Sequence, residues 1–332
     1  MVNPVARITS AAAALALVAA AFIPVQHARG ASMIPLRMAF STWTGYGPLV
    51  VGVQQHIWAK YGLDVSYSVI ESPSDRRDAL RAGRLDGAAT TVDTFSRWAG
   101  QNVPMVQVFG IDKSQGGDGI VAKKSITSVK QLKGKTVALN VGSTSEWFFD
   151  YVLQQNGMSV NDVQIVDMPS SGVAGSTFVA GKVDAAVTWE PWLSRARKAP
   201  SGHVLVSSKA YPNIIVDDFG FRPAFIKAHP GVIGDFIKGY YAAERKVAMR
   251  DSAAIASVGK YVGETAPQVV GDYSTVPLMD LAAGKAYFGT SAKPGPIYDI
   301  AKLSANFWLR SKIIRHLPDY AQIIDTSYME KM

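Results

Sequence analysis

The sequence predicts an α/β protein built from two similar lobes that face each other. Three observations support this prediction. A nine-residue segment recurs 98 residues later, at Gly83 and again at Gly181; each copy lies within alternating strand and helix patterns; and the chain is long enough for two cores. The 332 residues are 48% hydrophobic and 18% charged, a globular composition, because disordered chains carry far fewer apolar residues.

The repeat defines the elements of each half. Residues 82–90 read AGRLDGAAT and residues 180–188 read AGKVDAAVT. Each copy follows a helical pattern, at 75–81 and 175–179, and continues into a short apolar strand, at 87–91 and 185–189. Upstream, strands at 36–41 and 136–140 each precede a Gly- or Ser-rich loop and a helix, at 49–61 and 146–156. This alternation is typical of a mostly parallel sheet covered by helices.

The N-terminal residues 1–30 are predicted to be a secretory signal peptide cleaved near Gly30. Arg7 is followed by an apolar run from Ala11 to Ile23 and then by small residues around Gly30. This run is shorter than the roughly 20 residues that span a bilayer, although an uncleaved anchor is the alternative interpretation. Export would place the protein in the periplasm.

The remaining chain divides at two expected crossings between the lobes, near 118–122 and 215–221. Lobe 1 is predicted to comprise residues 31–120 and 221–332, and lobe 2 residues 121–220. The segment after Val216 starts no third copy of the repeat. Its helical patterns at 230–249, 251–262 and 297–310 are expected to pack back on lobe 1.

Composition excludes several kinds of chemistry. The chain has no Cys and only five His, so thiolate nucleophiles, Cys-ligated zinc and most His-based metal sites are unavailable. It shows no Ser-His-Asp spacing and no phosphate-binding Gly loop with Lys. We therefore expect no enzymatic activity, no cofactor and no metal. The net charge of +8 is spread along the chain, and export argues against a nucleic-acid partner.

A ligand is expected between the lobes, because open α/β sheets bind ligands at the carboxyl ends of their strands. The loops at these ends and the two crossings supply the predicted ligand-binding residues: Ser41, Trp43, Tyr46, Thr91, Asp93, Asp118, Ser143, Thr144, Glu146, Trp189, Glu190, Trp192 and Asp217. Asp118 could instead serve a Gly-rich turn and Glu146 a helix N-terminus. Asp217 and Asp218 cannot both face the cleft in an extended strand, and the sequence does not say which one does.

The charges of this set favour a cation. It holds carboxylates and aromatic rings but no Lys, Arg or His, and aromatic faces attract cations by ~0.5–2 kcal/mol each. An anion would more naturally use Arg, or a helix N-terminus with hydroxyl groups. The segment Gly142 to Ser145 could serve an anion in that second way, and it is the main observation against a cation.

Three segments resemble a known family: STWTGYGP at 41–48, SVKQLKGKTVA at 128–138 and AGKVDAA at 180–186. Over nearly all of the mature chain the sequence is similar to the periplasmic substrate-binding proteins of ABC importers, in the nitrate/sulfonate/taurine group. The resemblance implies the type II periplasmic binding protein fold, with two α/β lobes joined by hinge strands. The motif around Trp43 and the cluster Trp189-Glu190-Pro191-Trp192 resemble a narrower branch associated with urea carboxylase and guanidine.

The resemblance implies a monomer that closes on a small molecule and delivers it to a permease and, through the permease, to an ATPase. A small cationic or amide-like nitrogen compound, with guanidinium first, is the predicted ligand. The alternative is an aliphatic sulfonate such as taurine, which is a zwitterion, and choline-like amines stay open. A binding protein that serves a sensor has the same sequence features. A thiamin-pyrimidine synthase shares the fold, but it uses a cysteine-rich motif that this chain lacks.

Overall fold

The computed structural model describes Met1 and residues 33–332. The predicted signal peptide, apart from Met1, lies outside the described residues. Within the described part of the chain, no helix combines the length and the apolar character needed to cross a membrane.

Two five-stranded sheets form the framework, and they have the same design. The first has the strand order β2-β1-β3-β10-β4 and the second the order β7-β6-β8-β5-β9. In each sheet the first three strands are parallel, while the fourth, β10 or β5, runs antiparallel to both of its neighbours. The strands are β1 Ile34–Phe40, β2 Leu63–Val69, β3 Gly87–Thr91, β4 Val106–Lys113, β5 Asp118–Lys123, β6 Thr136–Leu139, β7 Gln164–Asp167, β8 Ala185–Trp189, β9 Gly202–Ser207 and β10 Val216–Phe221.

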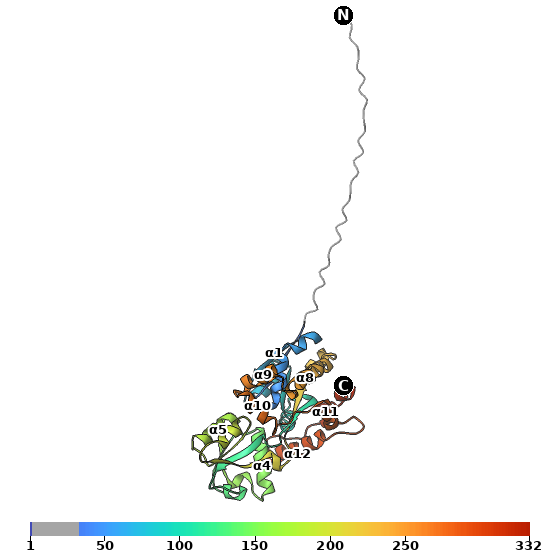
Figure 1. Ribbon diagram of the computed structural model, residues 1–332. Coiled ribbons are helices and arrows are strands. Elements are labelled where there is room, and N and C mark those ends of the chain that lie inside the picture. Colours follow the sequence, from blue (N-terminus) through green and yellow to red (C-terminus); the bar gives the residue numbers. More distant parts are fainter. Residues whose placement is uncertain (2–32) are drawn as a thin grey trace. The chain divides into compact units, whose positions relative to one another are not determined.

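Helices cover both faces of each sheet, as the alternating pattern predicts (Figure 1). We call the first sheet with its helices lobe 1 and the second sheet with its helices lobe 2. The α-helices are α1 Gly47–Gln54, α2 Pro73–Arg81, α3 Val92–Gly100, α4 Thr144–Gln155, α5 Ser171–Val179, α6 Trp192–Arg197, α7 Pro223–Ala228, α8 Val232–Ala248, α9 Ser252–Val262, α10 Ala266–Asp272, α11 Leu281–Phe288, α12 Ile297–Arg310, α13 Tyr320–Ile323 and α14 Ser327–Lys331. Short 3-10 helices lie at Thr44–Tyr46, Ile57–Tyr61, Val129–Leu132, Val160–Asp162 and Ser208–Ala210.

Each lobe has its own apolar core on either side of its sheet. In lobe 1, α1 and α8 pack on one face around Leu49 and Phe236, and α2 and α3 pack on the other around Leu80 and Trp98. In lobe 2, α4 covers one face, and α5 and α6 cover the other. Burial of these large side chains supplies most of the driving force for folding, at roughly 25 cal/mol per Å² of apolar surface. The predicted fold is confirmed: two α/β lobes, each built on a mostly parallel sheet.

The chain passes between the sheets in two short segments. One, at 114–117, joins β4 of the first sheet to β5 of the second, and the other, at 208–215, joins β9 to β10. Strand β10 falls inside the range predicted for lobe 2, yet it pairs with β3 and β4. We therefore propose that the crossings lie just before β5 and β10, and that the lobe boundaries move to them.

Candidate functional site

A cavity lies where the two lobes meet, at the edge of each sheet where the parallel strands end. Its enclosed volume is small, about 30 Å³, and the empty space between the lining side chains is about 350 Å³ when the open mouth is included. Both lobes contribute to its lining, which consists of Ser41, Trp43, Tyr46, Pro73, Arg76, Thr90, Thr91, Asp118, Thr144, Trp189, Ile215 and Asp217. Two aspartates hold matching positions in the two sheets: Asp217 pairs with Thr91 across β10 and β3, and Asp118 pairs with Trp189 across β5 and β8.

Arg76 is the cation of the cavity, and its side chain is only 2% exposed. Its Nη1 donates to the carbonyl oxygens of Ile70 and Glu71 at 2.5 and 3.3 Å, and its Nη2 donates to Oγ1 of Thr90 at 3.4 Å. Within the described residues no carboxylate lies within 4.0 Å of the guanidinium, and Nε has no hydrogen-bond partner. A buried, unpaired charge is costly, so this group is suited to an anion that enters the cavity.

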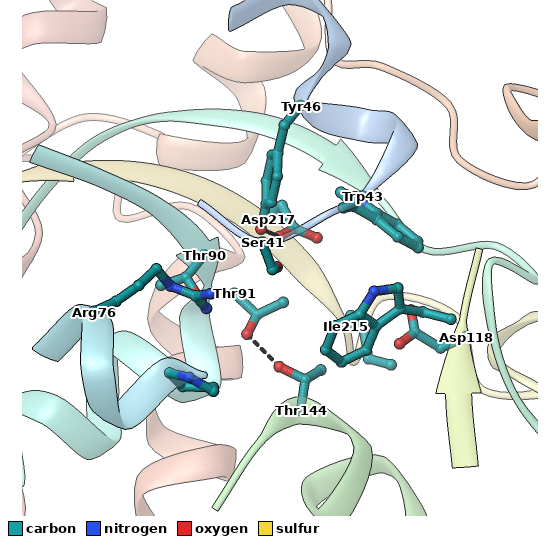
Figure 2. Close-up of a pocket in the computed structure, with 12 residues that line it drawn as sticks. Ser41, Trp43, Tyr46, Arg76, Thr90, Thr91, Asp118, Thr144, Ile215 and Asp217 are labelled. Carbon is teal, nitrogen blue, oxygen red and sulfur yellow. Dashed lines mark hydrogen bonds between the residues drawn. The ribbon is translucent and has the colours of Figure 1, made fainter. Parts of the chain in front are cut away.

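Hydroxyl groups form part of the cavity lining. Ser41, Thr90 and Thr91 come from lobe 1, and Thr144 from lobe 2. The Oγ1 atoms of Thr91 and Thr144 lie 2.7 Å apart and form a hydrogen bond between the lobes (Figure 2). The hydroxyls of Ser41 and Thr90 can each offer an O–H to a ligand oxygen without adding charge. Those of Thr91 and Thr144 already have acceptors within the protein, Oγ1 of Thr94 and Oδ1 of Asp93.

Three aromatic rings form the walls. Nε1 of Trp43 donates to Oδ2 of Asp112 at 3.0 Å, Nε1 of Trp189 donates to the carbonyl oxygen of Thr42 at 2.9 Å, and the Tyr46 hydroxyl donates to Asp217. Because the polar atoms of the rings are bonded within the protein, the rings contribute mainly apolar surface and the negative faces of their π-systems.

Carboxyl groups line the part of the cavity away from Arg76, which we call its acidic pole. Figure 2 shows Arg76 on one side of the cavity and Asp118 on the opposite side, with Asp217 between them. Burial raises the pKa of Asp118 to about 8. Burial also raises the pKa of Asp217 and of Asp112, and the proximity of these two carboxylates raises the pKa of Asp112 further. A cation near Asp118 and Asp217 would favour their ionised forms. Within the described residues, no group of three or more His, Asp or Glu side chains is placed to hold a metal ion.

The sequence left open which of two neighbouring aspartates faces the cavity, and the structure answers this. Asp217 lines the cavity, while Asp218 is fully buried and neither of its carboxylate oxygens has a partner among the described residues. Burial raises the pKa of Asp218 well above its usual range, and the neighbouring Asp217 raises it further.

Five of the predicted residues do not line the cavity. Ser143 caps α4 and is fully buried, Glu146 accepts from the backbone of Gly142, and Asp93 lies behind Thr144, whose Oγ1 is 3.3 Å from Oδ1 of Asp93. Glu190 accepts from the backbone and hydroxyl of Ser194 at 2.9 and 2.8 Å, and Trp192 packs against α5. Each side chain is held by its own helix or by a neighbouring helix, so its place in a strand-end loop does not bring it to the cavity.

The sequence analysis missed four residues that line the cavity: Arg76, Thr90, Pro73 and Ile215. Arg76 lies in the first half of helix α2 and not at the end of a strand. A search for ligand-binding residues at the carboxyl ends of strands therefore does not find it. The helical spacing of the sequence nevertheless places Arg76 on the buried face of this helix. Arg76, Ala79 and Leu80 share one face of α2 and all three are buried, whereas the neighbouring Arg77 and Arg81 are not.

A family model described as the NMT1-like family matches residues 30–262 of the sequence. The chain belongs to the NMT1-like family. This match covers most of the chain, including all but the C-terminal helices of lobe 1.

Several relatives of this NMT1-like protein are named as binding proteins. Putative binding proteins from Brucella abortus are 26% identical over 54% of this chain, and the match spans 56% of their own length. A putative aliphatic sulfonates-binding protein of Bacillus subtilis is 27% identical over 82% of this chain and 79% of its own. The taurine-binding periplasmic protein of Escherichia coli is 23% identical over 95% of this chain and 97% of its own.

Solved structures confirm the type of fold. The alkanesulfonate-binding protein of Xanthomonas axonopodis superposes with a TM-score of 0.75 at 16% identity, over 89% of this chain and 99% of its own. The predicted resemblance to the nitrate/sulfonate/taurine group of periplasmic binding proteins is therefore confirmed.

Proposed function

We propose that this NMT1-like protein is the extracytoplasmic substrate-binding component of an ABC importer and that its ligand is a small aliphatic sulfonate carrying an amino group, as taurine does. The protein would act in the periplasm as a monomer and deliver its ligand to a membrane permease coupled to an ATPase. The names of the relatives support the class of ligand. The observation that carries the proposal is the buried and unpaired Arg76 in the wall of the cavity.

The sulfonate group fits the part of the cavity around Arg76. A sulfonate has one negative charge shared by three oxygens, which can accept from the guanidinium and from the hydroxyl of Thr90. Hydrogen bonds to charged groups contribute about 1.5–3 kcal/mol each, so this pole would supply most of the affinity. The loop at 143–145 is a weaker candidate for the anion, because Ser143 donates to the carbonyl oxygen of Asn140 and Ser145 shares a hydrogen bond with Ser171.

The amino group fits the opposite part of the cavity. Asp118 and Asp217 provide carboxyl groups there whose ionised forms an ammonium would favour, and the rings of Trp43 and Trp189 provide cation-attracting faces. The carboxylates that favoured a cation in the sequence analysis thus have a role beside an anion-binding arginine. Guanidinium, the ligand that the sequence placed first, has no anionic group to pair with Arg76, and the comparisons favour the sulfonate alternative.

A calorimetric titration of the purified protein with taurine, ethanesulfonate and guanidinium tests this proposal. We expect taurine to bind most tightly, ethanesulfonate to bind about 10-fold more weakly because it lacks the ammonium, and guanidinium not to saturate the site. Saturable binding of guanidinium without a response to either sulfonate would overturn the proposal.

A further inference from the structure

The two lobes touch at a second place, away from the cavity. Nη2 of Arg195, on α6 of lobe 2, donates to the carbonyl oxygens of Val262 and Gly263 of lobe 1 at 3.0 and 3.2 Å. Val262 is the last residue of α9, and Gly263 follows it in a left-handed conformation, with φ of 70°. The last carbonyl groups of a helix have no partners within the helix and carry a partial negative charge, so a guanidinium is well suited to bind them.

Lobe 2 holds Arg195 in position for this contact. Its guanidinium carbon lies 4.4 Å from the centroid of the Trp192 ring, in a cation–π arrangement. Trp192 itself rests against Gly172 of α5, where a Cβ atom would lie only 2.9 Å from Cε2 of the ring. Trp192 was predicted to touch the ligand, whereas the structure places it beneath Arg195 at the contact between the lobes.

Acidic side chains of both lobes lie near this contact, so the positive charge of Arg195 also contributes to it. Glu264 and Asp272 of lobe 1 lie across the interface from Glu190 of lobe 2, and these three carboxylates line one crevice between the lobes. Oε2 of Glu264 is buried and has no hydrogen-bond partner among the described residues. Burial raises the pKa of Glu264, as does its neighbour Asp272, while Arg195 opposes this rise. Arg197 and Lys198 of lobe 2 line the same crevice, so removing Arg195 would weaken the attraction between these carboxylates and lobe 2 and would leave the end of α9 without its guanidinium partner.

Arg195 differs in one respect from the interlobe hydrogen bonds beside the cavity. The hydrogen bonds of Trp189 with Thr42 and of Thr91 with Thr144 involve residues that line the cavity, so any change there also changes the ligand site. Arg195 does not line the cavity. Its contribution to lobe contact can therefore be separated from ligand contact by mutation.

We propose that Arg195 is a positioning residue that stabilises the contact between the lobes and thereby slows ligand release without touching the ligand. The proposal rests on the ligand occupying the cavity between the lobes. Stabilising the form in which the lobes are in contact lowers the rate at which a bound molecule escapes, while the encounter with the separated lobes is unaffected.

A distance measurement between the lobes tests the contact without any ligand. The chain has no Cys, so spin labels can be attached at Val179→Cys in lobe 2 and Met249→Cys in lobe 1, both of which are exposed. We expect Arg195→Ala to shift the electron–electron distance distribution towards longer values and Arg195→Lys to shift it partly. Lys182→Ala, which removes a positive charge from an exposed turn of lobe 2, should leave it unchanged. Identical distributions for Arg195→Ala and the unaltered protein would overturn the proposal.

A kinetic measurement with taurine as the probe tests the consequence. In stopped-flow experiments we expect Arg195→Ala to raise the dissociation rate constant about 3- to 10-fold and to leave the association rate constant within about twofold. A slower association with unchanged dissociation would contradict the proposal. Absence of taurine binding in every variant would count against the proposed function, and the distance measurement would still decide the role of Arg195.

Discussion

The two copies of the internal repeat have the same backbone elements but contribute different chemistry to the cavity. Helix α2 and strand β3 of lobe 1 recur 98 residues later as α5 and β8 of lobe 2, with the same lengths. The serines that cap the two helices, Ser72 and Ser170, are separated by the same interval. At the position of Arg76, however, lobe 2 has Ala174, which is fully buried in the apolar core.

This difference shows how a repeated framework can form an asymmetric site. The capping residues and the turn before each strand are retained because the local fold depends on them. The charge is present in one copy only, so the proposed anion-binding side of the cavity belongs to lobe 1. Lobe 2 faces it with Asp118, Thr144 and Trp189. An asymmetric ligand with unlike ends suits such a cavity better than a symmetric cation does.

Placing the same charge in lobe 2 should have the largest effect. Ala174→Arg would bury an unpaired guanidinium in the core between α5 and the second sheet, and we expect it to lower the free energy of unfolding by about 4 kcal/mol. Chemical denaturation measures this change. Val173→Arg, on the same helix at a side chain that is 42% exposed, is the matched control and should change stability by less than about 0.5 kcal/mol. Equal stability of the two variants would mean that the buried position in lobe 2 tolerates an arginine as the matching position in lobe 1 does, which would contradict this comparison.

Removing the charge from lobe 1 should have the next largest effect, on binding. Arg76→Gln keeps hydrogen-bonding groups but removes the positive charge, and we expect taurine affinity to fall about 100-fold, or ~3 kcal/mol. Calorimetry measures the affinity. Arg81→Ala, on an exposed face of the same helix, is the control and should bind normally. Unchanged taurine affinity in Arg76→Gln would remove the anion pole from our account.

The repeated turn aspartates allow a comparison of stability alone. Asp86 accepts from Nε of Arg37 at 2.9 Å and from Nη2 of Arg222 at 3.2 Å, and its side chain is 7% exposed. Asp184 accepts from Nζ of Lys123 at 2.7 Å and is 26% exposed. We expect Asp86→Asn to cost about 2 kcal/mol of unfolding free energy and Asp184→Asn about 1 kcal/mol, because solvent screens the more exposed pair. Urea unfolding measures both free energies. A larger loss of stability in Asp184→Asn than in Asp86→Asn would contradict burial as the deciding factor. Neither variant should alter ligand binding.

A smaller effect on binding than that of Arg76→Gln should come from the acidic pole of the cavity. Asp118→Asn removes one partner of the proposed ammonium group, so taurine affinity should fall about 10-fold while ethanesulfonate affinity is retained or improved. Titrations with the two ligands side by side measure the difference. An equal loss for both ligands would place the sulfonate, and not the amine, near Asp118.

The same residue predicts a pH dependence of stability. The pKa of Asp118 rises from its ordinary value near 3.9 to about 8 because the group is buried. The folded protein therefore holds an extra proton between these two values, and its stability without ligand should fall as pH rises from about 4 to 8. Thermal unfolding at several pH values should show this fall, and the fall should be smaller in Asp118→Asn. An identical pH profile in the two proteins would contradict the raised pKa.

The sequence predicted the fold well, because the repeat and the strand–helix alternation are local patterns that fix a two-lobe α/β design. It also located part of the site. Ser41 and Trp43 follow β1, Trp189 is the last residue of β8, and all three line the cavity. It could not place Glu190, because whether that carboxylate turns to the cavity or to the backbone of Ser194 depends on the conformation of one loop. It passed over Arg76, because that residue reaches the cavity from the middle of a helix and not from a strand end.

The orientation of the ligand is the central claim, and a crystal structure of the protein with taurine tests it most directly. We predict that the sulfonate oxygens lie within hydrogen-bond distance of the Arg76 guanidinium and the Thr90 hydroxyl, with the ammonium directed to Asp118 and Asp217. A structure with the sulfonate at the 143–145 loop, or with the ammonium beside Arg76, would contradict it.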